Sequence, residues 1–213
     1  SGKRSICGFR KVVRWGTGIW RFDAPPTDVR GARVSFADRL GFFFLSRFSQ
    51  PAADRLVYRL IRKHRVRSIV EVGIGSGVRT TRMIRVAQQA SPDALISYAG
   101  IDLFEMRSGG VKLKDAYRAI KASGTKVRLI PGQFDNALPL KANDLTGTDL
   151  LVIASGQQAE PGSLGWFYVP RMLHAASHVL LEEKQGDRTA FRVLSRVEVE
   201  RLAAQHAAHL RAA

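Results

Sequence analysis

From residue 67 onward, short apolar runs alternate with longer amphipathic segments, and this alternation restricts the fold more than any other feature of the chain. A strand buried on both faces is apolar throughout, whereas a helix covering a sheet repeats apolar residues every three to four positions. The pattern therefore predicts an α/β fold, a three-layer sandwich around a mostly parallel sheet. Ser195 and Glu198 add a capping-box pattern that opens a last helix. We expect strands at 68–73, 95–102, 127–132, 149–155 and 178–183, a further short strand at 191–195, and helices at 78–90, 112–123 and 165–176.

The region before residue 67 has helical patterns in place of this alternation. Residues 35–48 are typical of a short apolar helix, and 49–65 of an amphipathic helix with Pro51 in its first turn. We therefore expect a helical extension, residues 1–66, packed on a sheet domain formed by residues 67–213.

The 213 residues carry a formal charge of +16, and this charge is unevenly placed. Residues 1–70 hold 16 basic and 4 acidic side chains, a net of +12, whereas 71–213 hold 18 and 14, a net of +4. Such a field favours anionic partners, but it also fits a solvated basic surface, and no known basic-reader motif accompanies it. Nucleic acid is therefore retained as a partner without being favoured. The same two interpretations apply to the basic row Arg55, Arg59, Arg62 and Lys63.

The single cysteine, Cys7, excludes an internal disulfide and a cysteine-based metal cluster, and it is compatible with a reducing compartment. No apolar run approaches the length of a bilayer span. We therefore expect a cytoplasmic protein.

Three alternating glycines, Gly73, Gly75 and Gly77, follow the first predicted strand. In an open parallel sheet the first strand-to-helix turn is where a nucleotide-type ligand approaches the backbone, and a side chain there would block it. The dinucleotide pattern Gly-x-Gly-x-x-Gly/Ala fails at Val78, and no Gly-Lys-Ser/Thr sequence follows, so a nicotinamide cofactor and a P-loop are disfavoured. A tight turn without a ligand is the alternative.

This region resembles the first two motifs of the class I S-adenosylmethionine-dependent methyltransferases, which have a Rossmann-like fold. The first motif, an acid followed by x-Gly-x-Gly-x-Gly, is matched by Glu71 and the three glycines, and the second, an acid ending the next strand, by Asp102. The resemblance implies that the glycine turn and Glu71 position the methionine part of S-adenosylmethionine. It implies that Asp102 accepts hydrogen bonds from both ribose hydroxyls, a role that suits a carboxylate. Each acid also has a structural interpretation, as a loop cap or a strand end.

The resemblance extends to the third predicted strand. There "PGQFDNALP" occupies the place where the family lines its adenine pocket, so Gln133, Phe134 and Asp135 are further cofactor-binding candidates. Phe134 equally fits a core position. No clear final hairpin of the kind that completes the family's seven-stranded sheet is visible, and we expect a shorter sheet.

Around the fourth predicted strand, "TDLLVIASGQQ" is similar to the Asp-Leu-x-x-Ile-Asp-Gly-Asp-His stretch of catechol O-methyltransferase-like enzymes, in which the second Asp can hold a divalent metal. Ala154 and Gln157 replace that Asp and the His. Because alanine cannot ligate a hard cation, we expect a metal-independent protein. No catalytic residue is assigned; Glu182 and Glu183 at a strand end, and His174 and His178 nearby, are candidate bases that equally fit structural roles.

The leading hypothesis is an S-adenosylmethionine-dependent methyltransferase acting on a small molecule. A non-catalytic methyltransferase-like binding protein is the first alternative, because recognisable catalytic groups are absent at Ala154 and Gln157. An RNA-modifying methyltransferase that docks through the basic N-terminal region is the second.

Overall fold

The computed structural model describes residues 11–15, 18–22, 45, 47, 49–157, 159–186 and 188–212, with the backbone alone at 11–15, 18–22, 185 and 206–212. Most of the predicted 35–48 helix lies outside these residues, although Leu45 and Arg47 are helical. Among the described residues, no helix is both long and apolar enough to cross a bilayer.

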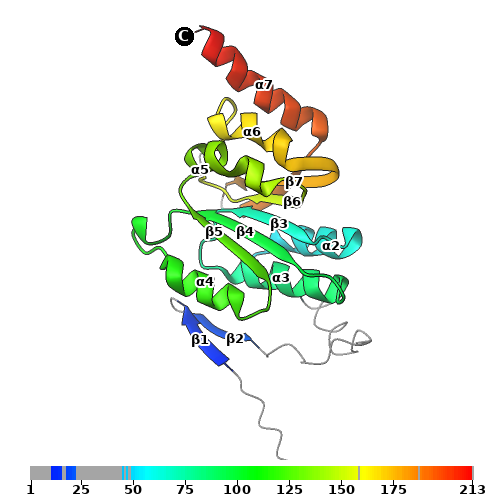
Figure 1. Ribbon diagram of the computed structural model, residues 1–213, viewed down its shortest axis with the longest axis vertical. Coiled ribbons are helices and arrows are strands. Elements are labelled where there is room, and N and C mark those ends of the chain that lie inside the picture. The colour runs from blue at the N-terminus through cyan, green and yellow to red at the C-terminus, as the bar shows by residue number, and fades with distance from the viewer. Residues whose placement is uncertain are drawn as a thin grey trace, which may run out of the picture.

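A six-stranded sheet forms the centre of the molecule, in the order β5-β4-β3-β6-β7-β8 (Figure 1). The first five strands of this order run parallel, and β8 is antiparallel to β7. The strands are β3 (Ser68–Val72), β4 (Ser97–Asp102), β5 (Lys126–Pro131), β6 (Thr148–Ile153), β7 (Leu173–Gln185) and β8 (Arg188–Leu194). The predicted α/β fold is confirmed.

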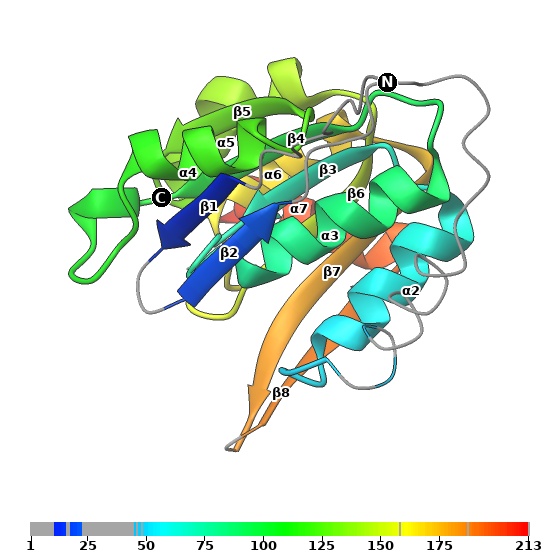
Figure 2. The same cartoon turned by 90° about the horizontal axis from the view of Figure 1, so that it is seen from below.

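Helices cover both faces of this sheet (Figure 2). One core cluster joins the sheet to the first set of helices, and another joins it to the second set. The first set is α2 (Asp54–His64), α3 (Val78–Ala90) and α4 (Leu113–Lys121); the second is α5 (Phe134–Lys141), α6 (Leu164–Met172) and α7 (Arg196–Ala212). Short 3₁₀ turns, η1 (Phe104–Met106) and η2 (Ala142–Leu145), follow β4 and α5.

The strand order reverses at β3, because β4 pairs on one side of it and β6 on the other. The chain therefore leaves the carboxyl ends of β3 and β6 in opposite directions. A crevice at such a switch point is where open α/β sheets bind ligands.

Two sequence predictions near the last strands are wrong. The predicted 165–176 helix ends at Met172, and Leu173 already belongs to β7. Leu173 pairs with Thr148 of β6, so sheet pairing overrides the helical pattern of the sequence from this residue on. The chain also contains a final hairpin, β7–β8, paired from Val179↔Leu194 to Gln185↔Arg188. The expectation of a sheet shorter than seven strands is confirmed.

The N-terminal region is not helical throughout. β1 (Lys11–Trp15) and β2 (Gly18–Phe22) pair antiparallel in a separate two-stranded sheet. Helix α2 begins at Asp54, so Pro51 lies in the preceding turn rather than in the helix. The division at residue 66 stays a prediction.

The predicted capping box is confirmed at the start of α7. The backbone amide of Ser195 donates to Glu198 Oε2 (2.8 Å), and the amide of Glu198 donates to Ser195 Oγ (3.3 Å). The two residues satisfy each other's amide groups and fix where the last helix begins.

Candidate functional site

The turn between β3 and α3 has a backbone that only glycine adopts easily. Gly73 has φ +86° and Gly75 has φ +60°, both in the left-handed region. A Cβ atom on Gly73 would lie 2.8 Å from the Cβ of Ala154 and from the Cδ of Gln157, whereas a Cβ on Gly75 would meet nothing within 4 Å. Gly73 therefore allows the turn to pack against the segment after β6, and Gly75 faces open space.

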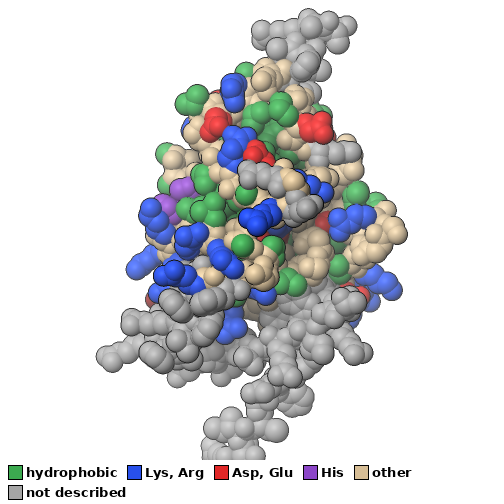
Figure 3. All heavy atoms as spheres, turned by 180° about the vertical axis from the view of Figure 1, so that it is seen from behind, with side chains coloured by type: hydrophobic (Ala, Val, Ile, Leu, Met, Phe, Trp, Pro, Cys, Tyr) green, Lys and Arg blue, Asp and Glu red, His purple; other side chains and the backbone are tan. Residues whose placement is uncertain are grey.

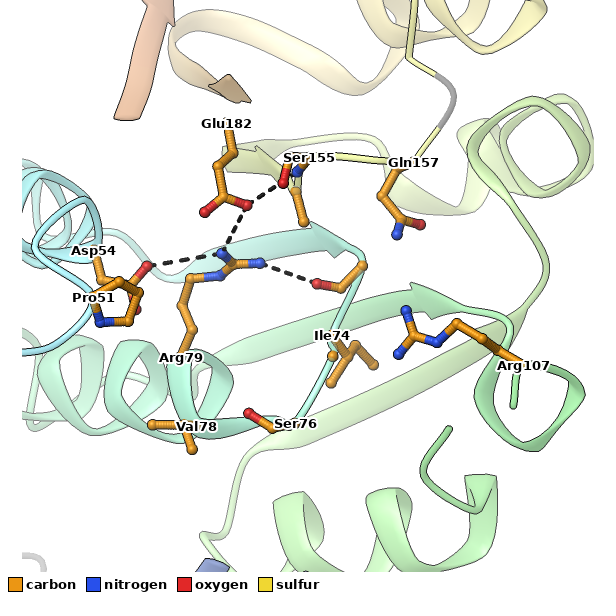
Figure 4. Close-up of a pocket in the computed structure, with 13 residues that line it drawn as sticks. Pro51, Asp54, Ile74, Ser76, Val78, Arg79, Arg107, Ser155, Gln157 and Glu182 are labelled. Carbon is orange, nitrogen blue, oxygen red and sulfur yellow. Dashed lines mark hydrogen bonds and ion pairs between the residues drawn. The ribbon is translucent and has the colours of Figure 1, made fainter. Parts of the chain in front are cut away.

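A pocket of about 260 Å³ lies at this turn, where the segments after β3 and β6 meet (Figure 4). Its walls come from the start of α2, the glycine turn, the beginning of α3, the segment after η1, and the ends of β6 and β7. The lining residues are Pro51, Asp54, Gly73, Ile74, Gly75, Ser76, Val78, Arg79, Arg107, Ala154, Ser155, Gln157 and Glu182.

Arg79, in the first turn of α3, connects the walls of this pocket. Its guanidinium donates to Glu71 Oε1 (2.8 Å) and to the carbonyl oxygen of Gly73 (3.0 Å). The same group lies 3.8 Å from an Asp54 oxygen and 3.6 Å from a Glu182 oxygen. Glu182 in turn accepts a hydrogen bond from the Ser155 amide (3.0 Å), so one network links α2, β3, α3, β7 and the segment after β6.

This network holds more negative than positive charge. Three carboxylates, those of Asp54, Glu71 and Glu182, surround one guanidinium. Burial raises the pKa of Asp54; Arg79 opposes this shift, whereas Glu71 and Glu182 add to it. Burial alone would lower the pKa of Arg79, but the carboxylates of Glu71, Asp54 and Glu182 together outweigh burial and raise that pKa. Asp54 Oδ1 is buried without a hydrogen-bond partner.

Arg107 supplies a positive charge on another wall of the pocket. In Figure 4 its guanidinium lies beside Ile74, across the pocket from Asp54 and Glu182. The pocket is therefore polarised, with excess carboxylate charge at one end and a guanidinium at the other. A ligand that carries separated positive and negative groups matches this arrangement.

Glu71, one of the sequence candidates, lies beneath the pocket rather than in its wall. Its carboxylate is completely buried and accepts hydrogen bonds from Arg79, Thr80 and Tyr98. Burial, followed by the charge of Glu71, raises the pKa of the Tyr98 hydroxyl well above its usual value. Glu71 therefore reaches the pocket through Arg79, and direct contact with a ligand stays a prediction.

Asp102 ends β4 as predicted and fastens the glycine turn. Its Oδ2 accepts from the Gly75 amide (3.0 Å) and its Oδ1 from the Phe104 amide (3.3 Å). The residue is only 3% exposed and is absent from the pocket wall. Each carboxylate oxygen keeps a second acceptor site, so the ribose role stays a prediction.

The three candidates after β5 lie away from the pocket wall. Phe134 is fully buried and packs edge-on against Trp166, with ring centroids 5.2 Å apart, which is the core position that the sequence left open. Asp135 accepts a hydrogen bond from the Gly165 amide (2.9 Å) at the start of α6. Gln133 occupies the N-cap position of α5 in an extended backbone conformation, without a side-chain capping hydrogen bond. Their contact with adenine is untested.

The four candidate bases are dispersed. Glu182 lines the pocket, whereas its neighbour Glu183 pairs with Arg192 on the surface. His174 lies 2.9 Å from Asp149, near where β6 begins, and His178 contacts the ring of His64 at 4.1 Å between centroids. Of the four, the structure brings only Glu182 to the pocket wall.

Sequence reasoning missed three charged residues of this site, Asp54, Arg79 and Arg107. A signal existed for the first, because Asp54 shares the i, i+3, i+4, i+7 spacing of the buried residues Val57, Tyr58 and Ile61. An acid on a buried helix face needs a partner, and that requirement marks it as part of a site.

No protein-family model and no curated protein matches the chain. Solved structures with a similar fold include the trans-methyltransferase CalH in complex with S-adenosylhomocysteine, at 18% identity and a TM-score of 0.45 over 71% of this chain and 42% of that one. The O-methyltransferase TomG from Streptomyces achromogenes, in complex with S-adenosylmethionine, has 16% identity and a TM-score of 0.45 over 84% and 76% of the two chains. An S-adenosylmethionine-dependent methyltransferase from Agrobacterium tumefaciens has 12% identity and a TM-score of 0.46 over 72% and 51%.

The chain spans less than half the length of CalH and about half that of the Agrobacterium protein. With TM-scores below 0.5, none of these likenesses carries a conclusion about what this chain binds.

Proposed function

We propose that this chain binds S-adenosylmethionine in the pocket beside the glycine turn and transfers its methyl group to a small molecule without a metal ion. The observation that supports this proposal best is the polarised pocket at the sheet's switch point. Its position matches the ligand site of open α/β sheets, and its charges match an amino acid.

The residues present fit the amino-acid end of this cofactor. Its ammonium group suits the end of the pocket formed by Asp54 and Glu182, and its carboxylate suits Arg107. The bare backbone at Gly75 leaves room for close approach. A volume of about 260 Å³ is below the roughly 300–1,000 Å³ of pockets for complete ligands, so it suits one end of the cofactor.

When bound, S-adenosylmethionine supplies a methyl group already activated by a sulfonium. The chain then has to hold the acceptor in line, and positioning alone supplies much of the rate. Glu182, held by the Ser155 amide and Arg79, is the acid we assign to the ammonium group of the cofactor, and the proton of the acceptor is released to solvent. The side chain of Ala154 in the pocket wall offers no ligand atom, which supports metal independence.

A non-catalytic cofactor-binding protein is the second candidate. It is favoured by the absence of recognisable catalytic groups at Ala154 and Gln157 in the pocket wall. A cytoplasmic location stays a prediction of the sequence.

Calorimetric titration with S-adenosylmethionine, S-adenosylhomocysteine and NAD tests the proposal. We expect the first two to bind and NAD to give no heat. The variant Glu182→Gln replaces the charged partner of the ammonium group by a neutral one. It should weaken cofactor binding about tenfold, since a hydrogen bond to a charged group contributes about 1.5–3 kcal/mol. Glu183→Gln is the matched control, because this neighbouring acid pairs with Arg192 outside the pocket, and its affinity should equal that of the wild type.

Absence of binding by folded wild-type protein would reject the proposal. Release of S-adenosylhomocysteine during incubation with hydroxyl-, amino- and thiol-bearing small molecules separates the two candidates, because a non-catalytic protein releases none.

A further inference from the structure

Charge is strongly segregated in the part of the chain that forms α2 and α3. Between Ser49 and Ser91 the sequence has nine Arg or Lys residues and only two acids. Both acids, Asp54 and Glu71, are buried and pair with Arg79. The segment therefore contains no exposed acid.

These basic residues share one side of the molecule. Helices α2 and α3 lie side by side on the same face of the sheet (Figure 2) and share a core cluster. Arg82 on α3 donates to the carbonyl oxygen of Gln50 before α2 (2.8 Å), which ties the two helices together. Figure 3 shows Lys and Arg side chains gathered beside the histidines on this side. The basic surface comprises the exposed residues Arg59, Arg62, Lys63, Arg65, Arg67 and Arg85.

Two further acids adjoin this segment, one by contact and one in sequence. Asp149 is engaged by the amides of Arg67 and Ser68 and by His174, and Asp93 follows α3. Helix α2 buries Val57, Tyr58 and Ile61 against the core, so its outward face is polar. None of the exposed large apolar side chains of the described chain lies between Ser49 and Ser91. An anionic membrane surface is a poor match, because interfacial helices insert an apolar face into the lipid.

The composition of the basic surface also distinguishes between nucleic-acid forms. Five of its six residues are arginines, whose planar guanidinium matches phosphate oxygens in bidentate fashion. Single-stranded nucleic acid is usually bound by stacking bases on aromatic side chains. The one Phe, Tyr or Trp between Ser49 and Ser91 is Tyr58, and it is buried. Contacts to the backbone of a duplex need no such platform.

We propose that the basic surface binds the sugar–phosphate backbone of duplex nucleic acid. This function goes beyond cofactor binding, and the surface is separate from the pocket, since none of its six residues lines it. The contacts are to phosphate and carry no base specificity, so RNA and DNA duplexes both supply the chemistry.

Fluorescence anisotropy with a labelled RNA duplex and a DNA duplex of the same sequence tests this proposal on the full chain. Affinity is measured between about 50 and 200 mM salt, where its logarithm falls with a slope of roughly 0.9 for each phosphate neutralised. The variant Arg59→Gln with Lys63→Gln removes two adjacent charges of α2. Its slope should decrease by about 2 and its affinity at 100 mM salt by about tenfold.

The matched control is Lys141→Gln with Arg171→Gln, which removes one lysine and one arginine from α5 and α6 on the opposite face. It changes the net charge by the same amount and should leave the slope unchanged. Thermal unfolding and titration with S-adenosylhomocysteine accompany each variant, so that loss of folding or of the cofactor site is recognised separately.

A decrease in slope confined to the α2 variant, with either duplex, supports the proposal. Three results would overturn it: no duplex binding by the wild type at about 50 mM salt, an equal effect in both variants, or no effect of the α2 variant. Anionic vesicles that compete fully with duplex for the wild type but not for the α2 variant would assign the surface to membranes instead.

Discussion

Replacing Arg79 with methionine removes the one positive charge at the centre of the buried network. Methionine keeps much of the aliphatic length of the side chain, so the change is mainly one of charge and hydrogen bonding. Arg79 is 12% exposed and contributes hydrogen bonds to Glu71 and to the Gly73 carbonyl. Removing one partner of a buried ion pair costs about 3–5 kcal/mol, a fifth or more of the roughly 5–15 kcal/mol that stabilises a typical domain.

The cost should depend on pH, and its sign follows from Asp54. Burial already raises the pKa of Asp54 in the wild type, and Arg79 is the group that opposes this shift most. Without Arg79 the pKa of the folded state rises further above that of the unfolded state. A raised pKa means that the folded state takes up a proton more readily, so stability is regained as the pH falls towards the folded-state value. Arg79→Met should therefore be more damaging at pH 8 than at pH 5.

Urea unfolding at both pH values measures this difference. Arg85→Met is the matched control: this arginine lies further along α3 and is exposed to solvent, so the change should cost about 0.5 kcal/mol or less at either pH. Asp54→Asn combined with Arg79→Met should recover part of the loss, because one uncompensated carboxylate is removed. A cost for Arg79→Met below about 1 kcal/mol, or one that is the same at both pH values, would refute the account of the network.

Three further changes test other parts of the structure. Gly165→Ala places a Cβ atom 2.5 Å from the ring of Phe134, so overpacking should lower the free energy of unfolding by about 1–3 kcal/mol in urea titration; an unchanged midpoint would contradict this packing. Ser195→Ala removes the side-chain half of the capping box with Glu198 and should cost about 1 kcal/mol, whereas Ser195→Thr, which keeps the hydroxyl, should retain most of the stability. Burial lowers the pKa of His178, so the unfolded state takes up a proton first and stability is lost as the pH falls through about 6.5; His178→Gln should reduce this loss between pH 7.5 and 5.5 in thermal melts, and identical profiles would disprove it.

The sequence predicted those features that depend on local pattern. Strand β3, the glycine turn and α3 were expected almost to the residue, because an apolar run, alternating glycines and an amphipathic segment lie next to one another. The start of α7 was equally predictable, since Ser195 and Glu198 satisfy each other within one turn. The start of β7 was not, because its first residues continue an apolar pattern that also fits a helix.

The charged network of the site could not be read from local pattern. Asp54, Glu71 and Glu182 are far apart in sequence and meet at Arg79 only because α2, β3 and β7 pack around the start of α3. Likewise, the acid at the end of β4 was expected from spacing, but its hydrogen bonds to the turn depend on the path of the chain after Asp102. Sequence thus located the crevice, whereas the structure was needed to identify the charges that line it.

Titration of S-adenosylhomocysteine into the wild type, Gly75→Leu and Gly186→Leu tests the central claim most directly. The two glycines have nearly the same backbone, φ +60° and +61°, and a Cβ atom on either meets nothing within 4 Å, so the strain of substitution is matched. Of these two glycines, only Gly75 lines the pocket. We predict that Gly75→Leu loses at least tenfold in affinity, about 1.4 kcal/mol, while Gly186→Leu binds like the wild type. Equal affinity of all three proteins, or no binding by any of them, would contradict the assignment of this pocket to the cofactor.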